Sequence, residues 1–322
     1  MYTVITGGAG FIGSHLTDHL LAAGDTVSVI DDFSTGSRAN LEHHLGGEPN
    51  LQVFQGSILD RPLVNQVVAG ADRVFHLAAA VGVRRIIAQP LDSLRINLHG
   101  SENVMEAALQ ANAVMVLAST SETYGKNTAD ALHEGSDRIL GDPLVSRWSY
   151  AAAKSLDESF AHAYWRECGL QVSIVRLFNT VGPRQTGRYG MVVPNLVGQA
   201  LRGEPLTVYG DGRQTRCFSY VGDIVPALVR LSEKPETRGQ AFNLGGAQEV
   251  SILHLARRII ELTGSTSEIE LVPYERAYGE GYEDMRRRVP DNSKAAAALG
   301  FSPNIGLDEI IHAVAEGLKG DS

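Results

Sequence analysis

The chain has 322 residues, of which 43% are hydrophobic and 20% are charged, and its formal net charge is −9. These values are typical of a folded globular protein, and the acidic balance argues against a nucleic-acid-binding surface. No apolar run approaches the roughly 20 residues that cross a bilayer, and the chain begins directly with a strand-like pattern, which predicts a cytoplasmic protein.

The first predicted strand, residues 2–6, runs into Gly7-Gly8-Ala9-Gly10-Phe11-Ile12-Gly13 and then into an amphipathic helix. Glycines at positions 7, 10 and 13 allow a tight turn and close approach of a pyrophosphate, which the free N–H groups of the helix N-terminus bind. A second strand ends in Asp31, 18 residues after Gly13. An acidic side chain there accepts hydrogen bonds from the adenosine ribose and repels a 2′-phosphate, so the unit predicts NAD. Arg38 is the nearby residue that would instead suit a 2′-phosphate.

Strand-like runs recur at residues 51–54, 74–77, 114–118 and 172–177, and helical periodicity separates them. This alternation predicts an α/β fold with a Rossmann-like, doubly wound parallel sheet, in which ligands bind beyond the carboxyl ends of the strands. Glycine and proline become frequent after residue 178. We therefore predict an NAD-binding domain over residues 1–178, with returning segments near residues 217–244, and a smaller, interleaved C-terminal substrate domain over residues 179–322.

Chemically informative residues follow the fifth predicted strand. Thr120 lies in Ser-Thr-Ser-Glu at residues 119–122, and further along the chain Tyr150 and Lys154 share one face of a predicted helix. A phenol is a weak base at neutral pH, but a neighbouring ammonium and an oxidised nicotinamide both favour the phenolate. Tyr150 is therefore predicted to remove a proton from a sugar hydroxyl, with Thr120 hydrogen-bonded to the same oxygen.

Together these motifs resemble the extended short-chain dehydrogenase/reductases that modify nucleotide sugars, over essentially the full length. The resemblance also rests on His76-Leu77-Ala78-Ala79, Arg176-Leu177-Phe178-Asn179, Gly182-Pro183-Arg184 and Thr215-Arg216. It implies dinucleotide contacts from Gly7, Gly10, Phe11, Ile12, Gly13, Asp31, Ser57, Ile58, Leu77, Ala78, Ala79, Tyr150 and Lys154. It implies substrate contacts from Val83, Ser121, Asn179, Arg188, Val193, Tyr209, Arg216 and Arg288, with Asn179 and Arg216 on the diphosphate of a UDP-type donor. At Ser57 the chain departs from relatives, which usually carry an aspartate facing the adenine.

Members of this family share a first step, in which the tyrosine takes the O4 proton, the C4 hydride passes to NAD and a 4-keto sugar forms. Glu122, Arg288 and the segment 146–149 resemble the site of UDP-glucuronate decarboxylases. In this interpretation a carboxylate beside the substrate carboxylate destabilises the ground state, and an arginine stabilises the developing enolate. We predict decarboxylation of UDP-glucuronate to UDP-xylose or its 4-keto form, with catalytic residues Thr120, Glu122, Tyr150, Lys154 and Arg288.

Other reactions remain open. A 4-epimerase acting on UDP-glucuronate or UDP-glucose would return the hydride to the other face, with Arg188 holding a uronate carboxylate against loss of carbon dioxide. A nucleotide-sugar 4,6-dehydratase is less favoured, because Ser121 replaces the aspartate of a Thr-Asp-Glu triplet, although GDP-mannose dehydratases carry Thr-Ser-Glu. An inactive NAD-binding sensor is disfavoured by the intact Thr120, Tyr150 and Lys154.

The expected partners follow from the same resemblance. Apolar helix faces at residues 101–110 and 156–165 imply a four-helix interface in a homodimer. Cys168 and Cys217 lack a metal-type spacing, so we expect reduced thiols and no metal site. The predicted partners are a UDP-sugar, NAD and a second copy of the chain, with no nucleic acid and no membrane.

Overall fold

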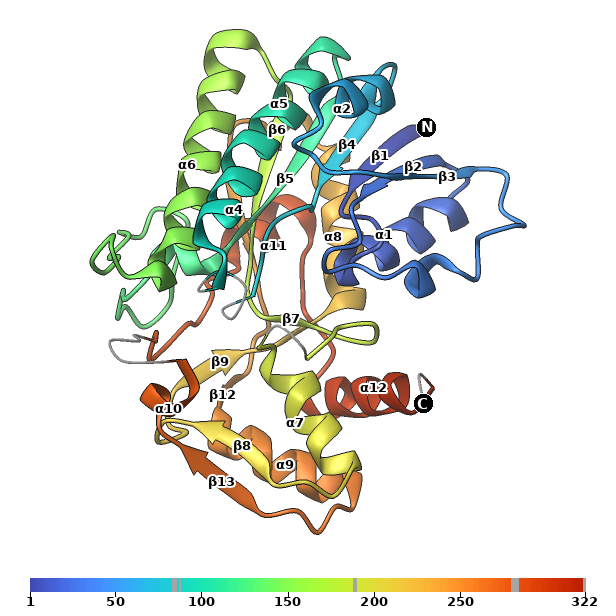
Figure 1. Ribbon diagram of the computed structural model, residues 1–322. Helices are drawn as coiled ribbons and strands as arrows, with labels where there is room; N and C mark the ends of the chain where they lie inside the picture. The colour runs from blue at the N-terminus through green and yellow to red at the C-terminus, as the bar shows by residue number, and fades with distance from the viewer. Residues whose placement is uncertain (83–85, 87, 188–189, 279–283, 321–322) are drawn as a thin grey trace.

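The computed structural model describes residues 1–82, 86, 88–187, 190–278 and 284–320, and Figure 1 shows their arrangement. In these residues a parallel sheet of seven strands has the order β11-β6-β5-β4-β1-β2-β3. The strands are β1 (Tyr2–Thr6), β2 (Thr26–Asp31), β3 (Leu51–Gln55), β4 (Arg73–His76), β5 (Val114–Thr120), β6 (Val172–Leu177) and β11 (Ala241–Leu244). The predicted fold class is confirmed, and the strand expected at residues 74–77 lies one residue earlier.

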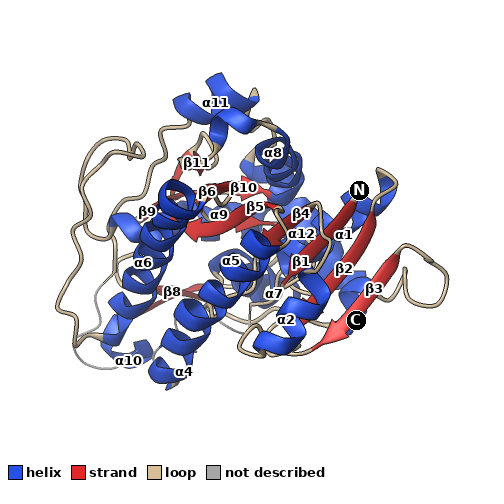
Figure 2. Ribbon diagram, turned by 90° about the horizontal axis from the view of Figure 1, so that it is seen from above, coloured by secondary structure: helices blue, strands red, loops and turns tan. Residues whose placement is uncertain are grey.

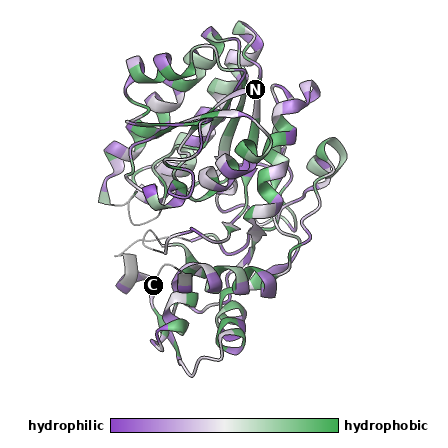
Figure 3. Cartoon of the chain, turned by 90° about the vertical axis from the view of Figure 1, so that its right-hand side faces the viewer, coloured by the Kyte–Doolittle hydropathy of each residue, from purple (hydrophilic) through white to green (hydrophobic). Residues whose placement is uncertain are grey.

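Helices cover both faces of this sheet, as Figure 2 shows. One face carries α1 (Phe11–Ala22), α8 (Val221–Glu233) and α11 (Ser293–Leu299). The other carries α2 (Arg61–Val68), α5 (Ser101–Gln110) and α6 (Ser149–Ala163), with the short α4 (Pro90–Arg95) beside α6. Strands covered on both sides become continuous apolar runs, and hydrophobic colouring follows the central strands in Figure 3.

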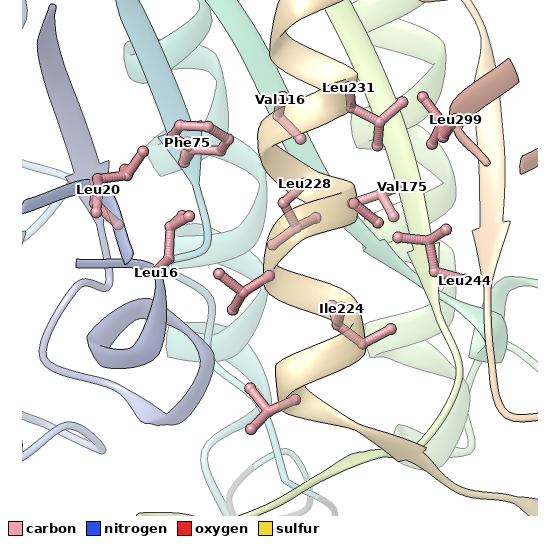
Figure 4. Packing of buried hydrophobic residues seen from close by; sticks show 14 of the residues in the cluster. Leu16, Leu20, Phe75, Val116, Val175, Ile224, Leu228, Leu231, Leu244 and Leu299 are labelled. Atoms are coloured by element: carbon pink, nitrogen blue, oxygen red, sulfur yellow. The ribbon is translucent and has the colours of Figure 1, made fainter. Parts of the chain in front are cut away.

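The core on the α8 face is built from side chains far apart in the sequence (Figure 4). Leu16 and Leu20 of α1 and Leu228 of α8 are fully buried with Phe75 of β4 and Val175 of β6. Burial of such side chains contributes about 1.5–3 kcal/mol each. This packing holds α1, and therefore the glycine-rich turn that precedes it, against the sheet.

Segments after β6, apart from α8, β11 and α11, build a smaller part at the bottom of Figure 1. Its strands pair as β7 (Thr180–Val181) with β10 (Ser219–Tyr220), β8 (Leu206–Tyr209) with β13 (Ile269–Val272), and β9 (Thr215–Cys217) with β12 (Glu249–Ser251). Its helices are α7 (Val192–Leu201), α9 (Ile252–Thr263), α10 (Tyr274–Tyr278) and α12 (Leu307–Gly320). A separate apolar cluster joins α7, α9 and α12. The division into domains at residues 178 and 179 stays a prediction. β11 lies within the returning segments predicted near residues 217–244, and it pairs with β6.

The polypeptide contains a turn that only glycine fits. Gly7 has φ +76°, and a Cβ on Gly13 would lie 2.1 Å from the carbonyl oxygen of Gly7. The N-terminus of α1 therefore approaches the end of β1 as closely as the backbone allows. Among the described residues, no helix has the length and apolar character needed to cross a membrane.

Candidate active site

A cavity of about 470 Å³ lies at the carboxyl ends of the central strands and is closed from below by the smaller part. Pockets of this size accommodate cofactors and substrates. Every predicted site residue within the described part of the chain lines it: Gly7, Gly10, Phe11, Ile12, Gly13, Asp31, Ser57, Ile58, Leu77, Ala78, Ala79, Thr120, Ser121, Glu122, Tyr150, Lys154, Asn179, Val193, Tyr209, Arg216 and Arg288. Val83 and Arg188, also predicted, lie outside the described residues.

The glycine-rich half of the cavity is ordered by Asp31. Its carboxylate oxygens accept hydrogen bonds from the backbone N–H groups of Ala9 (2.9 Å) and Phe33 (2.8 Å). Burial raises the pKa of Asp31 above its ordinary value. A carboxylate has about four acceptor positions, so two remain for ribose hydroxyls.

The same half fits a dinucleotide. A Cβ on Gly7 would lie 2.7 Å from the backbone nitrogen of Ala78, so glycine is needed for the turn after β1 to pack against the loop after β4. Both segments line the cavity, where the N-terminus of α1 can bind a ligand's phosphates. Arg38, the residue that would suit a 2′-phosphate, instead donates to Gln55 at 2.7 Å and stacks on the ring of Phe33. These contacts favour NAD over NADP.

Tyr150 and Lys154 lie on α6 and reach the cavity near Thr120 at the end of β5. The structure adds Asp157, whose Oδ2 accepts a hydrogen bond from Lys154 Nζ at 3.1 Å, with both side chains almost fully buried. Burial, followed by the charges of Glu122 and Asp157, raises the pKa of Tyr150. From the sequence, the Lys154 ammonium and an oxidised nicotinamide were both expected to favour the phenolate. Because Asp157 compensates the ammonium charge, Lys154 by itself does not produce a phenolate.

A buried polar chain continues behind Asp157. Ser101 Oγ lies 3.1 Å from Asp157 Oδ2 and 3.0 Å from His76 Nε2, and His76 Nδ1 lies 2.7 Å from Thr6 Oγ1. Burial, reinforced by the charge of Lys154, lowers the pKa of His76 well below its ordinary value. The imidazole is therefore neutral, and the chain links α6 rigidly to β1 and β4.

At the opposite end of the cavity, Glu122 is held between two arginines. Arg147 binds it through two hydrogen bonds, at 2.6 and 3.2 Å, and Arg288 Nη1 lies 3.7 Å from its Oε1. Burial would raise the pKa of Glu122, but Arg147 and Arg288 hold it below its ordinary value. This pairing offsets the like-charge repulsion that the sequence argument assumed.

Arg288 also connects the end of β5 to the loop after β6. It donates to Asn179 Oδ1 at 2.9 Å and to Ser121 Oγ at 3.3 Å. Burial and the nearby charge of Arg216 lower the pKa of Arg288 to about 10, which still leaves it protonated at neutral pH.

Sequence reasoning assigned no role to Arg147, Asp157 or Asp284. Arg147 lies three residues before Tyr150, in a short 3-10 turn (Ser146–Trp148) just before α6, and this position was the available signal. Asp284 accepts from Arg216 Nη2 at 3.1 Å and from the Tyr274 hydroxyl at 2.9 Å. Arg216, which was predicted to hold a diphosphate, is thus paired with Asp284, and no local sequence pattern indicates this pairing.

A family model described as GDP-mannose 4,6 dehydratase matches residues 4–314. The chain belongs to this family. Within the family, it is 40% identical over 307 residues to UDP-N-acetyl-alpha-D-glucosaminuronate decarboxylase of Bacillus cytotoxicus, covering 95% of this chain and 94% of that protein. It is also 40% identical over 308 residues to UDP-glucuronic acid decarboxylase 1 of Xenopus tropicalis, covering 95% of this chain and 69% of that protein. The predicted family resemblance is confirmed.

Solved structures of similar proteins span several reactions. UDP-glucuronic acid 4-epimerase from Bacillus cereus, in complex with UDP-glucuronic acid and NAD, is 28% identical with a TM-score of 0.89 over 100% of both chains. DesIV from Streptomyces venezuelae, a dTDP-glucose 4,6-dehydratase with NAD bound, is 28% identical with a TM-score of 0.89 over 100% of this chain and 98% of that one. The fold and family are therefore shared by decarboxylases, epimerases and dehydratases. The names of the relatives agree with the predicted enzyme class, a nucleotide-sugar decarboxylase or 4-epimerase.

Proposed function

We propose that this protein binds NAD and decarboxylates a UDP-linked hexuronate, UDP-glucuronate foremost, through a 4-keto intermediate. The observation that carries the proposal is Glu122 held between Arg147 and Arg288 in the cavity that Tyr150 lines. Two guanidinium groups and one carboxylate leave a net positive charge, which suits a substrate carboxylate better than the neutral hydroxymethyl group of a glucose substrate. The decarboxylase names of the relatives at 40% identity support the same reaction.

Each site residue has a proposed role that follows from its position in the cavity. Tyr150 accepts the O4 proton while Thr120 orients the oxygen, and NAD bound in the glycine-rich half would supply the acceptor for the C4 hydride. The resulting ketone is β to the carboxylate, so the bond from C5 to the carboxylate breaks and its electron pair moves into the C4 carbonyl. Arg288 stabilises the enolate, and Glu122 controls the proton that C5 regains. Reduction of the 4-keto group would give UDP-xylose, and release before that reduction would give the 4-keto sugar.

The alternative is 4-epimerisation of UDP-glucuronate or UDP-glucose, in line with the Bacillus cereus structure. We would incubate the purified protein with catalytic NAD and, separately, UDP-glucuronate, UDP-N-acetylglucosaminuronate and UDP-glucose. Mass spectrometry and proton NMR follow the sugar. Loss of one carbon dioxide from a uronate supports the proposal. An unchanged mass with inverted C4 identifies an epimerase, and comparison of the two uronates identifies the preferred substituent at C2.

The roles of Glu122 and Arg288 are tested separately from the overall reaction. Glu122→Gln and Arg288→Lys should spare oxidation at C4, which the absorbance of NADH reports, and should slow release of carbon dioxide by about 100-fold or more. Full turnover in both variants would show that the residue assignment is wrong even if the protein is a decarboxylase.

We also propose that the protein is a homodimer in which α5 and α6 pack against their copies. Leu156 of α6 and Leu91 of the neighbouring α4 are 45% and 57% exposed. Leu156→Glu should convert a dimer into a monomer in sedimentation velocity, and an unchanged sedimentation coefficient would contradict this interface. The cytoplasmic location expected from the sequence stays a prediction.

A further inference from the structure

A cluster of metal-ligating side chains lies outside the cavity. Asp18 of α1 faces His43 and His44, which follow a short turn of 3-10 helix at Arg38–Leu41. The Nε2 atoms of His43 and His44 lie 3.0 and 2.8 Å from the same oxygen, Oδ1 of Asp18. Over the described ranges of the chain, this is the one group of three such side chains with ligand atoms all within 4.8 Å of one another.

We propose that Asp18, His43 and His44 form a binding site for a divalent transition metal of the Zn²⁺ type. Two imidazole nitrogens and one carboxylate oxygen are a ligand set that zinc accepts, with a water completing a tetrahedron. Bonds of about 2.0–2.1 Å place tetrahedral ligand atoms roughly 3.3 Å apart. The two nitrogen–oxygen spacings of 2.8 and 3.0 Å need only a small expansion, and the two imidazole nitrogens lie within 4.8 Å of each other.

The ligands are held by the fold rather than by their own contacts. Leu41, just before the histidines, is buried in the main core. Ser37 N and Asn40 Nδ2 both donate to the carbonyl oxygen of Ala9, at 3.0 and 2.8 Å. Ser37 before the turn, and Asn40 and Leu41 within it, therefore anchor the turn to the loop before α1 and to the core. Binding a metal would then cost the side chains of the site little conformational entropy.

The surrounding charge also bears on affinity. Arg184 Nη1 lies 2.8 Å from Asp18 Oδ2, the oxygen that faces away from the histidines. A metal on Oδ1 leaves this ion pair in place, where the guanidinium orients the carboxylate but repels the dication. Nitrogen ligands disfavour Mg²⁺ and Ca²⁺, which prefer oxygen. The site is thus expected to select Zn²⁺, Co²⁺, Ni²⁺ or Cu²⁺ against the hard cations.

The test uses the full-length protein after removal of any affinity tag. Titration with Zn²⁺ should show saturable one-to-one binding that Mg²⁺ does not reproduce. Co²⁺ should give the visible absorption of a tetrahedral centre. A saturating metal should raise the Tm by a few degrees, because it binds the folded state.

Variants locate the site. Asp18→Asn and His44→Ala should each weaken Zn²⁺ binding by at least about 10-fold, whereas Arg184→Gln should strengthen it by removing a like charge. His19→Ala is the matched control, because His19 lies on the same helix but is exposed outside the cluster. Absence of saturable binding, or equal binding by wild type, Asp18→Asn and His44→Ala, overturns the proposal. Equal loss in His19→Ala overturns the assignment of ligands, and thermal unfolding without metal confirms that each variant is folded.

Discussion

The two ends of the cavity are built by different means. The cofactor end is a backbone structure: Gly7, Gly13 and Asp31 come from one strand-turn-helix-strand unit. The substrate end is made of side-chain charges, with Glu122 joined to Arg147 and Arg288, and Arg216 joined to Asp284. A local motif can therefore form a phosphate-binding site, whereas the selection of a substrate depends on charged side chains that the whole fold brings together.

Gly13→Ala should have the largest effect, a loss of NAD affinity, because it adds a Cβ to the tightly packed backbone at the cofactor end of the cavity. The added Cβ would lie 2.1 Å from the Gly7 oxygen and 2.7 Å from the Gly8 Cα, and backbone atoms cannot move aside cheaply. We expect at least ~100-fold weaker NAD binding by calorimetry, from about 3 kcal/mol of overpacking. Gly47→Ala is the control, since its Cβ meets nothing within 4 Å. Similar NAD affinities for Gly13→Ala and Gly47→Ala would show that the close contact between position 13 and the Gly7 carbonyl oxygen does not matter for NAD binding.

Arg147→Gln tests the substrate end of the cavity, where charged side chains are paired. Without this guanidinium, burial dominates and the pKa of Glu122 rises, so Glu122 takes up a proton at higher pH than in the wild type. Carbon dioxide release should fall about 30-fold near neutrality and recover as pH increases. The acid limb of the pH profile for carbon dioxide release should therefore move to higher pH, while the affinity for NAD stays unchanged. The exposed Arg202→Gln is the control, and a uniform loss at every pH would argue for simple misfolding.

Asp284→Asn should act in the opposite direction. It removes the carboxylate that is paired with Arg216, so the guanidinium is free for a diphosphate and a repulsive charge is lost. The KM for the UDP-sugar should fall by about 3–10-fold with kcat little changed. Tyr274→Phe, which removes only the hydroxyl donor to Asp284, should shift KM less. A higher KM in Asp284→Asn would mean that Asp284 positions Arg216 for binding.

Asp157→Asn should have the smallest effect on the rate of reaction, seen as a shift in its pH dependence. It should also lower the Tm, because the buried Lys154 ammonium loses its carboxylate partner. After burial and Glu122, the charge of Asp157 is the next cause that raises the pKa of Tyr150, so neutralising it lowers that pKa. The acid limb of C4 oxidation, measured in single turnovers by NADH absorbance, should move to lower pH by up to about one unit. Glu167→Gln, an exposed carboxylate at the end of the same helical segment, should leave the profile in place.

Some site residues could be predicted from the sequence because the motifs that identify them span only one or two adjacent elements. The distance from Gly13 to Asp31 and the pair Tyr150 and Lys154 each fall within one or two adjacent elements, and the structure places all four at the cavity. Arg147 was quoted only as part of a segment, because nothing in its neighbours shows that its guanidinium turns back to a residue before α6. The metal cluster was missed altogether, since no standard ligand spacing joins Asp18 to two adjacent histidines.

The alternation of strands and helices, the glycine-rich turn and the acid at the end of β2 could be predicted from the sequence, because periodicity and backbone freedom act over a few residues. Which charges compensate each other depends instead on the tertiary structure. The contacts of Glu122 with Arg147, Arg216 with Asp284, and Ser121 with Arg288 join residues 25, 68 and 167 positions apart. Buried charges take whichever partner the packing of the sheet and the smaller part brings within reach, and that distance is a property of the fold.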